Sequence, residues 1–158
     1  MQERILEQAI LARPVERRDQ AAWRVLWDGY NAFYGRSGAT ALSEETVLTT
    51  WARFFDGNEP VHCLIAESAG CVVGFAHYLF HRSTIRIGPS CYLQDLFVAE
   101  TARGLGAGRA LLEAAGVQAK AGGAVRLYWQ TQSSNAAAMR LYASVADASD
   151  AVTYRRTL

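Results

Sequence analysis

A group of glycines lies where a strand-like segment meets a helix-like one, and it constrains the fold more than any other part of the chain. Residues 95–115 read DLFVAETARGLGAGRALLEAA: an apolar stretch, glycines at 104, 106 and 108, and an alanine-rich amphipathic segment. Glycine weakens a helix, but it lets backbone N–H groups approach a ligand without hindrance from a Cβ. At a helix N-terminus such amides bind anions, helped by the helix dipole. The stretch predicts either a phosphate-binding turn between a strand and a helix, or a plain glycine-rich turn.

Three phosphate-binding patterns can be compared with these glycines. A P-loop needs a Lys directly after its last glycine, and none is present. A dinucleotide fingerprint starting at Gly106 would need a third glycine where Leu111 stands, and an acid about 20 residues later is also missing. The remaining pattern is Arg103-x-x-Gly106-x-Gly108, which the sequence contains.

Hydrophobic periodicity predicts the remaining elements. Alternation and apolar runs indicate strands at 10–15, 90–99, 124–131 and 150–158, and a hairpin over 61–80. Helical spacing indicates helices over 18–35, 43–57, 106–120 and 133–146. The order predicts an α+β fold with α/β/α layers, in which a mixed, mostly antiparallel sheet of about six to seven strands carries about four helices. No repeat or linker divides the chain, so we expect one domain over 1–158 with its core from about residue 10.

Composition excludes several classes of protein. The net charge is +1 without a basic run, which argues against a nucleic-acid partner, and no apolar run is long enough to cross a membrane. Three cysteines without CxxC spacing indicate a reducing compartment. His77 and His81 lie four residues apart without a nearby third ligand, so no metal site is expected. Residues 1–20 contain no signal-peptide core, and we expect a cytoplasmic protein.

A second pair of residues follows the glycines in the chain. In SSNAAAMRLY, Asn135 stands seven residues before Tyr142. Two helical turns separate them, so a capping amide and a phenol can face the same groove. Taken singly, Asn135 is explained as an ordinary helix cap and Tyr142 as a half-buried core aromatic. Their occurrence together, in order after the glycine turn, favours a binding site.

These motifs resemble the GCN5-related N-acetyltransferase (GNAT) superfamily, whose acetyl-CoA loop reads [RQ]-x-x-G-x-[GA] and is matched by RGLGAG at 103–108. The segments YLQDLFVAETARGLGAGRALL and YWQTQSSNAAAMRLY are similar to the branch of Hpa2-type and diamine acetyltransferases. The resemblance implies a splayed sheet at the acetyl-CoA site. It also implies that Tyr142 is close to the sulfur and that acetyl-CoA is bound by Leu96, Phe97, Val98, Arg103, Gly104, Leu105, Gly106, Ala107, Gly108, Arg109, Asn135 and Ala138.

The sequence departs from this branch at two places. Gln94 stands where diamine acetyltransferases carry a Glu that binds substrate, and an amide cannot act as a base. Asp95 is adjacent, but strand alternation points it to the opposite face unless a bulge intervenes. VADASD at 145–150 lacks the Gly-aromatic pair common after the Tyr of the family.

The resemblance implies direct attack of an amine on the thioester. Tyr142 would donate to the leaving thiolate, and the proton of the amine would reach Asp95 or another acid through water. The acceptor is a small amine, polyamine, amino acid or protein lysine, with Trp27, Tyr30, Tyr34 and Gln94 as candidates for its wall; the three aromatics also fit a plain core stripe. The alternatives are a non-catalytic acyl-CoA sensor and, in another class, a nucleotide-binding domain. Members of this branch are commonly dimers, and DAVTYRRTL at 150–158 is expected to pair as an edge strand of a homodimer.

Overall fold

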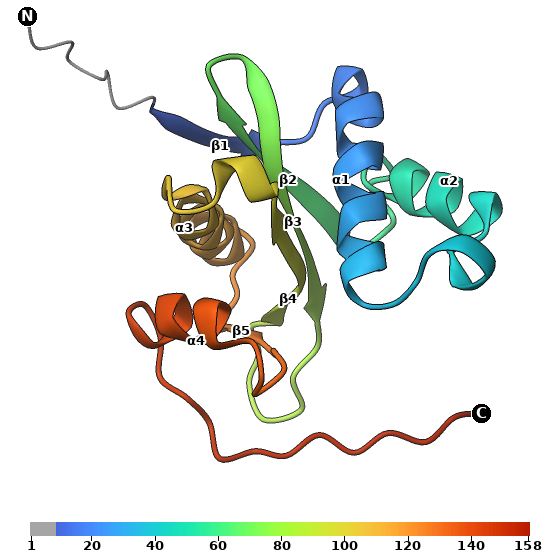
Figure 1. Cartoon of the computed structure of the whole chain (residues 1–158). Helices are drawn as coiled ribbons and strands as arrows, with labels where there is room; N and C mark the ends of the chain where they lie inside the picture. Colours follow the sequence, from blue (N-terminus) through green and yellow to red (C-terminus); the bar gives the residue numbers. More distant parts are fainter. Residues whose placement is uncertain (1–8) are drawn as a thin grey trace, which may run out of the picture.

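The computed structural model describes residues 9–158, so the first eight residues of the segment examined for a signal peptide lie outside the described residues. One sheet of five strands forms its centre, in the order β1-β2-β3-β4-β5 (Figure 1). Neighbours from β1 to β4 are antiparallel, and β4 and β5 are parallel. The strands are β1 (Ile10–Pro14), β2 (Val61–Ser68), β3 (Cys71–His81), β4 (Ser90–Val98) and β5 (Arg126–Trp129). The mixed α+β architecture is confirmed, with five strands in place of the expected six to seven.

Four α-helices are present in residues 9–158, and two of them begin at a side-chain cap. The four are α1 (Gln20–Phe33), α2 (Glu44–Arg53), α3 (Ala107–Ala121) and α4 (Ala136–Ala143), with short 3₁₀ turns at Arg17–Asp19, Gly38–Thr40 and Glu100–Ala102. The hydroxyl of Ser43 accepts a hydrogen bond from the amide of Thr46 and caps α2. Asn135 caps α4 in the same way, because its side chain accepts from the amide of Ala138. No helix in the described part of the chain is long and apolar enough to span a bilayer.

Each face of the sheet is covered by its own apolar cluster, which produces three layers (Figure 1). On one face α3 packs through Leu111, Leu112 and Ala115 against the sheet. On the other, α1 and α2 bury an aromatic cluster that includes Trp23, Trp27, Trp51 and Phe75. Truncating a fully buried side chain such as Leu111 to Ala would cost about 2–5 kcal/mol.

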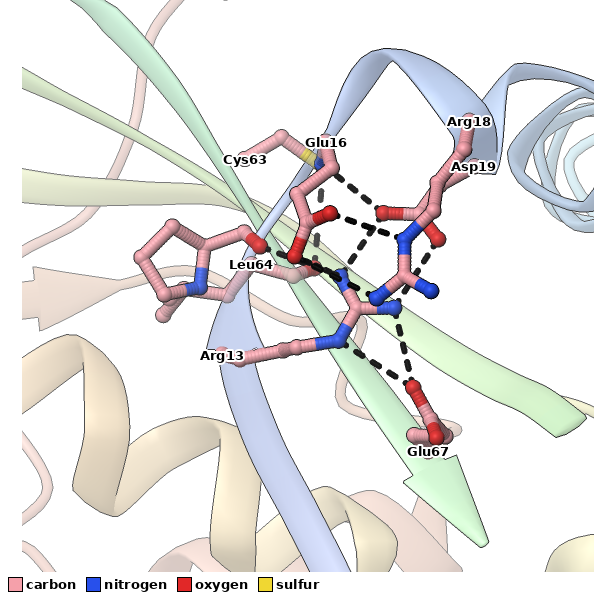
Figure 2. A network of polar contacts seen from close by, with 8 residues as sticks. Arg13, Glu16, Arg18, Asp19, Cys63, Leu64 and Glu67 are labelled. Carbon is pink, nitrogen blue, oxygen red and sulfur yellow. Dashed lines mark hydrogen bonds and ion pairs between the residues drawn. The ribbon is translucent and has the colours of Figure 1, made fainter. Parts of the chain in front are cut away.

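The junction between β1 and α1 is fastened by an ion-pair network (Figure 2). The guanidinium of Arg13 lies between two carboxylates, 2.8 Å from Asp19 and 2.9 Å from Glu67. Asp19 is buried, and it also accepts a hydrogen bond from the amide of Glu16. The hydrogen bond from Arg13 lowers the pKa of Asp19, against the effect of burial. This network fixes the first helix to the edge of the sheet.

A bulge in β4 changes which way its side chains point. His77 pairs with Asp95 and the next residue, Tyr78, pairs with Leu93, so Gln94 is an extra residue in the strand. The bulge reverses the alternation and places Asp95 beside His77, on the face that α1 and α2 cover.

The C-terminal part of the chain differs from the prediction. The expected helix over 133–146 is confirmed in shorter form, but the strand predicted over 150–158 is wrong. Residues 147–158 carry no helix or strand and are exposed, and they run away from the sheet in Figure 1. The side chain of Gln130 donates to Thr153 at 2.7 Å, and this is a side-chain contact rather than a ladder of backbone bonds. The alternating apolar residues of 150–158 are compatible with a strand, but a strand also needs a neighbouring strand to pair with, and the sequence pattern does not show whether one is present.

Candidate active site

A cavity of about 240 Å³ opens where β4 and β5 separate, beneath α4. Strand β5 pairs with β4 from Ser90 to Leu93 and stops there. Beyond that point the β4 edge that β5 leaves uncovered is available for hydrogen bonds to a bound molecule. The cavity brings together ten of the residues predicted from the sequence: Tyr30, Tyr34, Gln94, Leu96, Val98, Arg103, Gly108, Asn135, Ala138 and Tyr142.

The glycine turn leads into this cavity. Gly104 and Gly106 have φ of +79° and +87°, values that a residue with a Cβ rarely adopts. Gly106 is the N-cap of α3, and no side chain of the described residues bonds to the first turn as a cap. A Cβ on Gly108 would lie 3.2 Å from Leu141 of α4, so this glycine allows the two helices to approach. The uncapped amides and the dipole of a 15-residue helix fit a pyrophosphate group.

The other predicted cofactor-binding residues lie around the turn in different settings. Arg103 lines the cavity and donates to the carbonyl of Val98 at 3.3 Å. Arg109 points toward α4, where it donates to Ser144 at 2.9 Å. Ala107 is buried in the core and Leu105 is exposed. The side chain of Phe97 packs in the aromatic cluster on the opposite face, and Phe97 is not among the residues that line the cavity.

Tyr142 lies across the cavity from the aromatic residues of α1. Its ring packs edge-on against Trp129 of β5, with ring centroids 5.4 Å apart. Burial raises the pKa of the Tyr142 phenol, and the nearby Tyr34 adds to the effect. The phenol is therefore protonated at neutral pH and can serve as a hydrogen-bond donor.

Asp95 belongs to a buried chain of hydrogen bonds. Its Oδ2 lies 2.9 Å from Nδ1 of His77, and Nε2 of His77 lies 2.9 Å from the indole nitrogen of Trp23. All three residues are buried, with exposed fractions of 9%, 3% and 1%. Tyr30 also reaches Asp95: burial, the charge of Asp95 and a hydrogen bond with it raise the pKa of the Tyr30 phenol.

A second cavity of about 230 Å³ lies on the α1 and α2 face. Its polar lining includes Asp95 and His77, and Arg53 from the end of α2, while Phe54, Val61 and Leu79 supply apolar wall. Trp27 also lines it, and its indole N–H is buried without a partner among residues 9–158. Gln94 lines both cavities, which makes the bulge the place where the two sites meet.

Sequence reasoning alone did not find His77, Arg53 or Trp129. His77 reads as a packing residue because its partner Asp95 is 18 residues away in the chain. The possibility of a β4 bulge was the one available signal for this pair. Within residues 9–158, no group of three or more His, Cys, Asp or Glu side chains is arranged to hold a metal ion.

Comparison with known sequences gives the same family across most of the chain. The profile of the acetyltransferase (GNAT) family matches residues 21–146. The D-amino-acid N-acetyltransferase HPA3 of Saccharomyces cerevisiae is 35% identical over 156 residues, covering 98% of this chain and 94% of the relative. The uncharacterized N-acetyltransferase YhfO of Bacillus subtilis is 36% identical over 130 residues, covering 82% and 84%.

Solved structures agree in fold. The aminoglycoside N-acetyltransferase AAC(6')-Iy, solved in complex with CoA, superposes with a TM-score of 0.79. The two chains are 16% identical, and the match covers 95% of each. At this identity the likeness concerns the fold alone.

Proposed function

Because this chain belongs to the acetyltransferase (GNAT) family and is an N-acetyltransferase that uses acetyl-CoA, we propose that it transfers the acetyl group directly to the primary amine of a small molecule. The observation that carries the proposal is the cavity at the strand separation. One opening joins the free edge of β4, the uncapped start of α3 and the phenol of Tyr142. These features fit the pantetheine arm, the pyrophosphate and the sulfur of acetyl-CoA in that order.

The proposed chemistry needs no acyl-enzyme. The amine nitrogen attacks the thioester carbon, a C–N bond forms, the C–S bond breaks, and the thiolate of CoA takes a proton from Tyr142. An alkylammonium has a pKa of about 10.4, so the acceptor must lose a proton before it attacks. We assign Asp95 as the group that takes this first proton, directly or through water. After the attack, the nitrogen loses a second proton, which reprotonates Tyr142. Asp95 then releases the first proton to solvent. Gln94, whose amide has no basic site, would orient the acceptor at the meeting point of the two cavities.

The second cavity is the proposed acceptor site, and its charges suit an amino acid. Asp95 would attract the ammonium group. Arg53 and the unpartnered indole N–H of Trp27 are available for a carboxylate. The name of the yeast relative, a D-amino-acid N-acetyltransferase, supports the same class of acceptor. Tyr30 of α1 and Tyr34, directly after that helix, would close the wall between this site and the thioester.

The test is release of free CoA thiol with a panel of acceptors. We would compare D- and L-amino acids, polyamines, an aminoglycoside and a lysine peptide, each at saturating acetyl-CoA. Turnover with amino acids above that with the other amines supports the proposal. Acetyl-CoA binding without turnover on any acceptor would instead indicate a non-catalytic acyl-CoA sensor, a function that the protonated phenol of Tyr142 in the cavity disfavours.

The proposal includes a homodimer in the cytoplasm. The odd number of cysteines without CxxC spacing supports the compartment. The segment 147–158 joins no strand among the described residues of its own chain, and its exposed side chains of Val152 and Tyr154 would contact a second copy. A monomeric mass by light scattering, unchanged on deletion of 147–158, would contradict the dimer.

A further inference from the structure

Trp23, His77 and Asp95 form a chain of hydrogen bonds whose direction is determined by its first member. An indole N–H can only donate. Since it lies 2.9 Å from Nε2 of His77, that nitrogen must hold a lone pair and accept. The proton of a neutral imidazole is then on Nδ1, which lies 2.9 Å from Oδ2 of Asp95 and donates to it.

We propose that Trp23 and His77 are positioning residues that hold the carboxylate of Asp95 in a fixed orientation, in which it can take the proton of the acceptor. The inference rests on the proposed function only in its last step, the proton transfer. Trp23 fixes the tautomer of His77, His77 donates to one carboxylate oxygen, and the other oxygen of Asp95 has no bond to the imidazole. The bulge at Gln94 is what brings Asp95 into line with His77.

The surroundings of the pair keep the carboxylate without a buried counterion. Four titratable or charged groups face it from α1, α2, β2 and β4: Tyr30, Arg53, Cys63 and Tyr92. Burial raises the pKa of both phenols and of the thiol, so these three are neutral at physiological pH. Arg53 is half exposed and lies 3.7 Å from Glu59. An acceptor ammonium in the cavity is therefore the natural partner for the charge of Asp95.

A second proton on His77 would break this arrangement. An N–H at Nε2 would point at the N–H of Trp23 and leave a buried donor without an acceptor. The imidazolium would also form an ion pair with Asp95, 2.9 Å away, and would compete with the acceptor for that carboxylate. Trp23 thus excludes a protonation state of His77 that would lower activity.

Nitrogen NMR of protein with labelled histidines tests the tautomer without any enzyme assay. The described histidines are His62, His77 and His81, and the variants His62→Gln and His81→Gln identify the signal of His77 by elimination. We expect His77 to carry its proton on Nδ1, with Nε2 unprotonated, between about pH 6 and 8. This range includes the ordinary pKa of a histidine side chain, about 6.5. A proton on Nε2 in this range would overturn the inference.

The kinetic test uses two matched tryptophan substitutions. Trp23→Phe keeps an aromatic ring but removes the donor to His77, and Trp51→Phe makes the same change in the neighbouring ring of the cluster, 5.0 Å away. In Trp23→Phe we expect kcat to fall about tenfold, part of the roughly 100-fold or more that general base catalysis supplies. The acid limb of its pH profile should move to higher pH, because His77 can then bind a second proton. Equal pH profiles for the two variants would overturn the inference.

A conservative replacement separates positioning from packing. His77→Asn retains an N–H donor close to the Nδ1 position, whereas His77→Phe fills the space without a donor. Greater kcat in His77→Asn than in His77→Phe, at equal melting temperature, is the expected result. Equal kcat in both would show that the donor is unimportant. Absence of acetyl transfer in the wild type would defeat the proposed function, while the tautomer measured by NMR would still decide this inference.

Discussion

Tyr142 of α4 and Tyr34, the residue that follows α1, line the same cavity, and the proximity of Tyr34 contributes to the raised pKa of Tyr142. A phenol that stays protonated at neutral pH can donate to a leaving thiolate. We therefore predict that Tyr142→Phe lowers kcat by about 10- to 100-fold, at the lower end of the range for an acid catalyst. The dissociation constant for acetyl-CoA should change less than twofold, because the aromatic ring remains against Trp129.

The control for this variant is Tyr154→Phe, which removes the same hydroxyl from an exposed residue far along the C-terminal segment. Initial rates and a calorimetric titration with acetyl-CoA measure both quantities. Unchanged kcat in Tyr142→Phe would remove Tyr142 from the mechanism.

Asp95→Asn should separate proton removal from binding. The amide is almost isosteric with the carboxylate but cannot take a proton, so we expect kcat to fall by about 10²- to 10⁴-fold. Affinity for acetyl-CoA should stay near that of the wild type, because Asp95 lines only the second cavity, the proposed acceptor site. Measurement of the rate against pH adds a second check. At high pH the acceptor is mostly free amine and needs no base, so the kcat of Asp95→Asn should recover part of its loss there.

Gln94→Glu is the matched variant at the neighbouring position, because it adds a carboxylate where the bulge faces both cavities. It should favour cationic diamine acceptors over amino acids, whose carboxylate it would repel. If Gln94→Glu lowered kcat more than Asp95→Asn did, the roles assigned to Gln94 in orienting the acceptor and to Asp95 in taking its proton would be contradicted.

The proposed role of the glycine turn in binding CoA can be tested by replacing glycine with alanine at Gly106 in the turn and, as a control, at Gly116 inside α3. Gly106 has a φ of +87°, so Gly106→Ala places a strained residue at the cap of α3 and should cost about 1–2 kcal/mol. We expect it to raise the dissociation constant for CoA about tenfold or more by displacing the first amides of the helix, since 1.4 kcal/mol is a factor of ten.

Gly116→Ala is the control, because Gly116 lies inside α3 and a Cβ there would meet nothing within 4 Å. That change should stabilise the helix by about 0.5–1 kcal/mol and leave CoA affinity unchanged. Isothermal titration with CoA and thermal melts read out the two effects. Equal CoA affinity in both variants would contradict the role of the turn.

Much of the lining of the first cavity, the proposed acetyl-CoA site, could be predicted from the sequence because its signals are local. The cap at Asn135, the positive-φ glycines and the position of Tyr142 all follow from residues within one or two turns of each other. The second cavity, the proposed acceptor site, depends on pairing between distant segments. A one-residue bulge at Gln94 hardly changes the apolar pattern, yet it decides whether Asp95 meets His77. The C-terminal strand failed for a related reason, since alternation predicts a strand but gives no information about its partner.

Asp19 and Arg13 give a prediction for stability against pH. The pKa of Asp19 is lowered in the folded state, so its contribution is present above the unfolded value of about 3.9 and is lost as pH falls through the folded value. Asp19→Asn should therefore lower the free energy of unfolding by about 1–3 kcal/mol at pH 7, because Arg13 loses its charge-assisted hydrogen bonds to the carboxylate of residue 19. The difference from wild type should shrink steadily below about pH 4. Urea unfolding of both proteins across this pH range measures the difference. The control is Asp28→Asn, which breaks an exposed ion pair with Arg24 and should lower the free energy of unfolding by about 0.5 kcal/mol or less.

Arg53→Gln tests how the acceptor is recognised. The guanidinium of Arg53, at the end of α2, lines the proposed acceptor cavity together with Asp95 and would pair with a carboxylate there. We expect KM for an amino acid to rise about tenfold, the value of one partly exposed charge-assisted contact of about 1.4 kcal/mol. The amine that lacks the carboxylate but is otherwise identical should keep its KM, because it has no group for Arg53 to bind. Arg18→Gln, which removes a guanidinium bonded to Glu16 outside both cavities, is the matched control. An equal rise in KM for the amino acid and its decarboxylated analogue would show that Arg53 shapes the cavity and does not recognise the carboxylate.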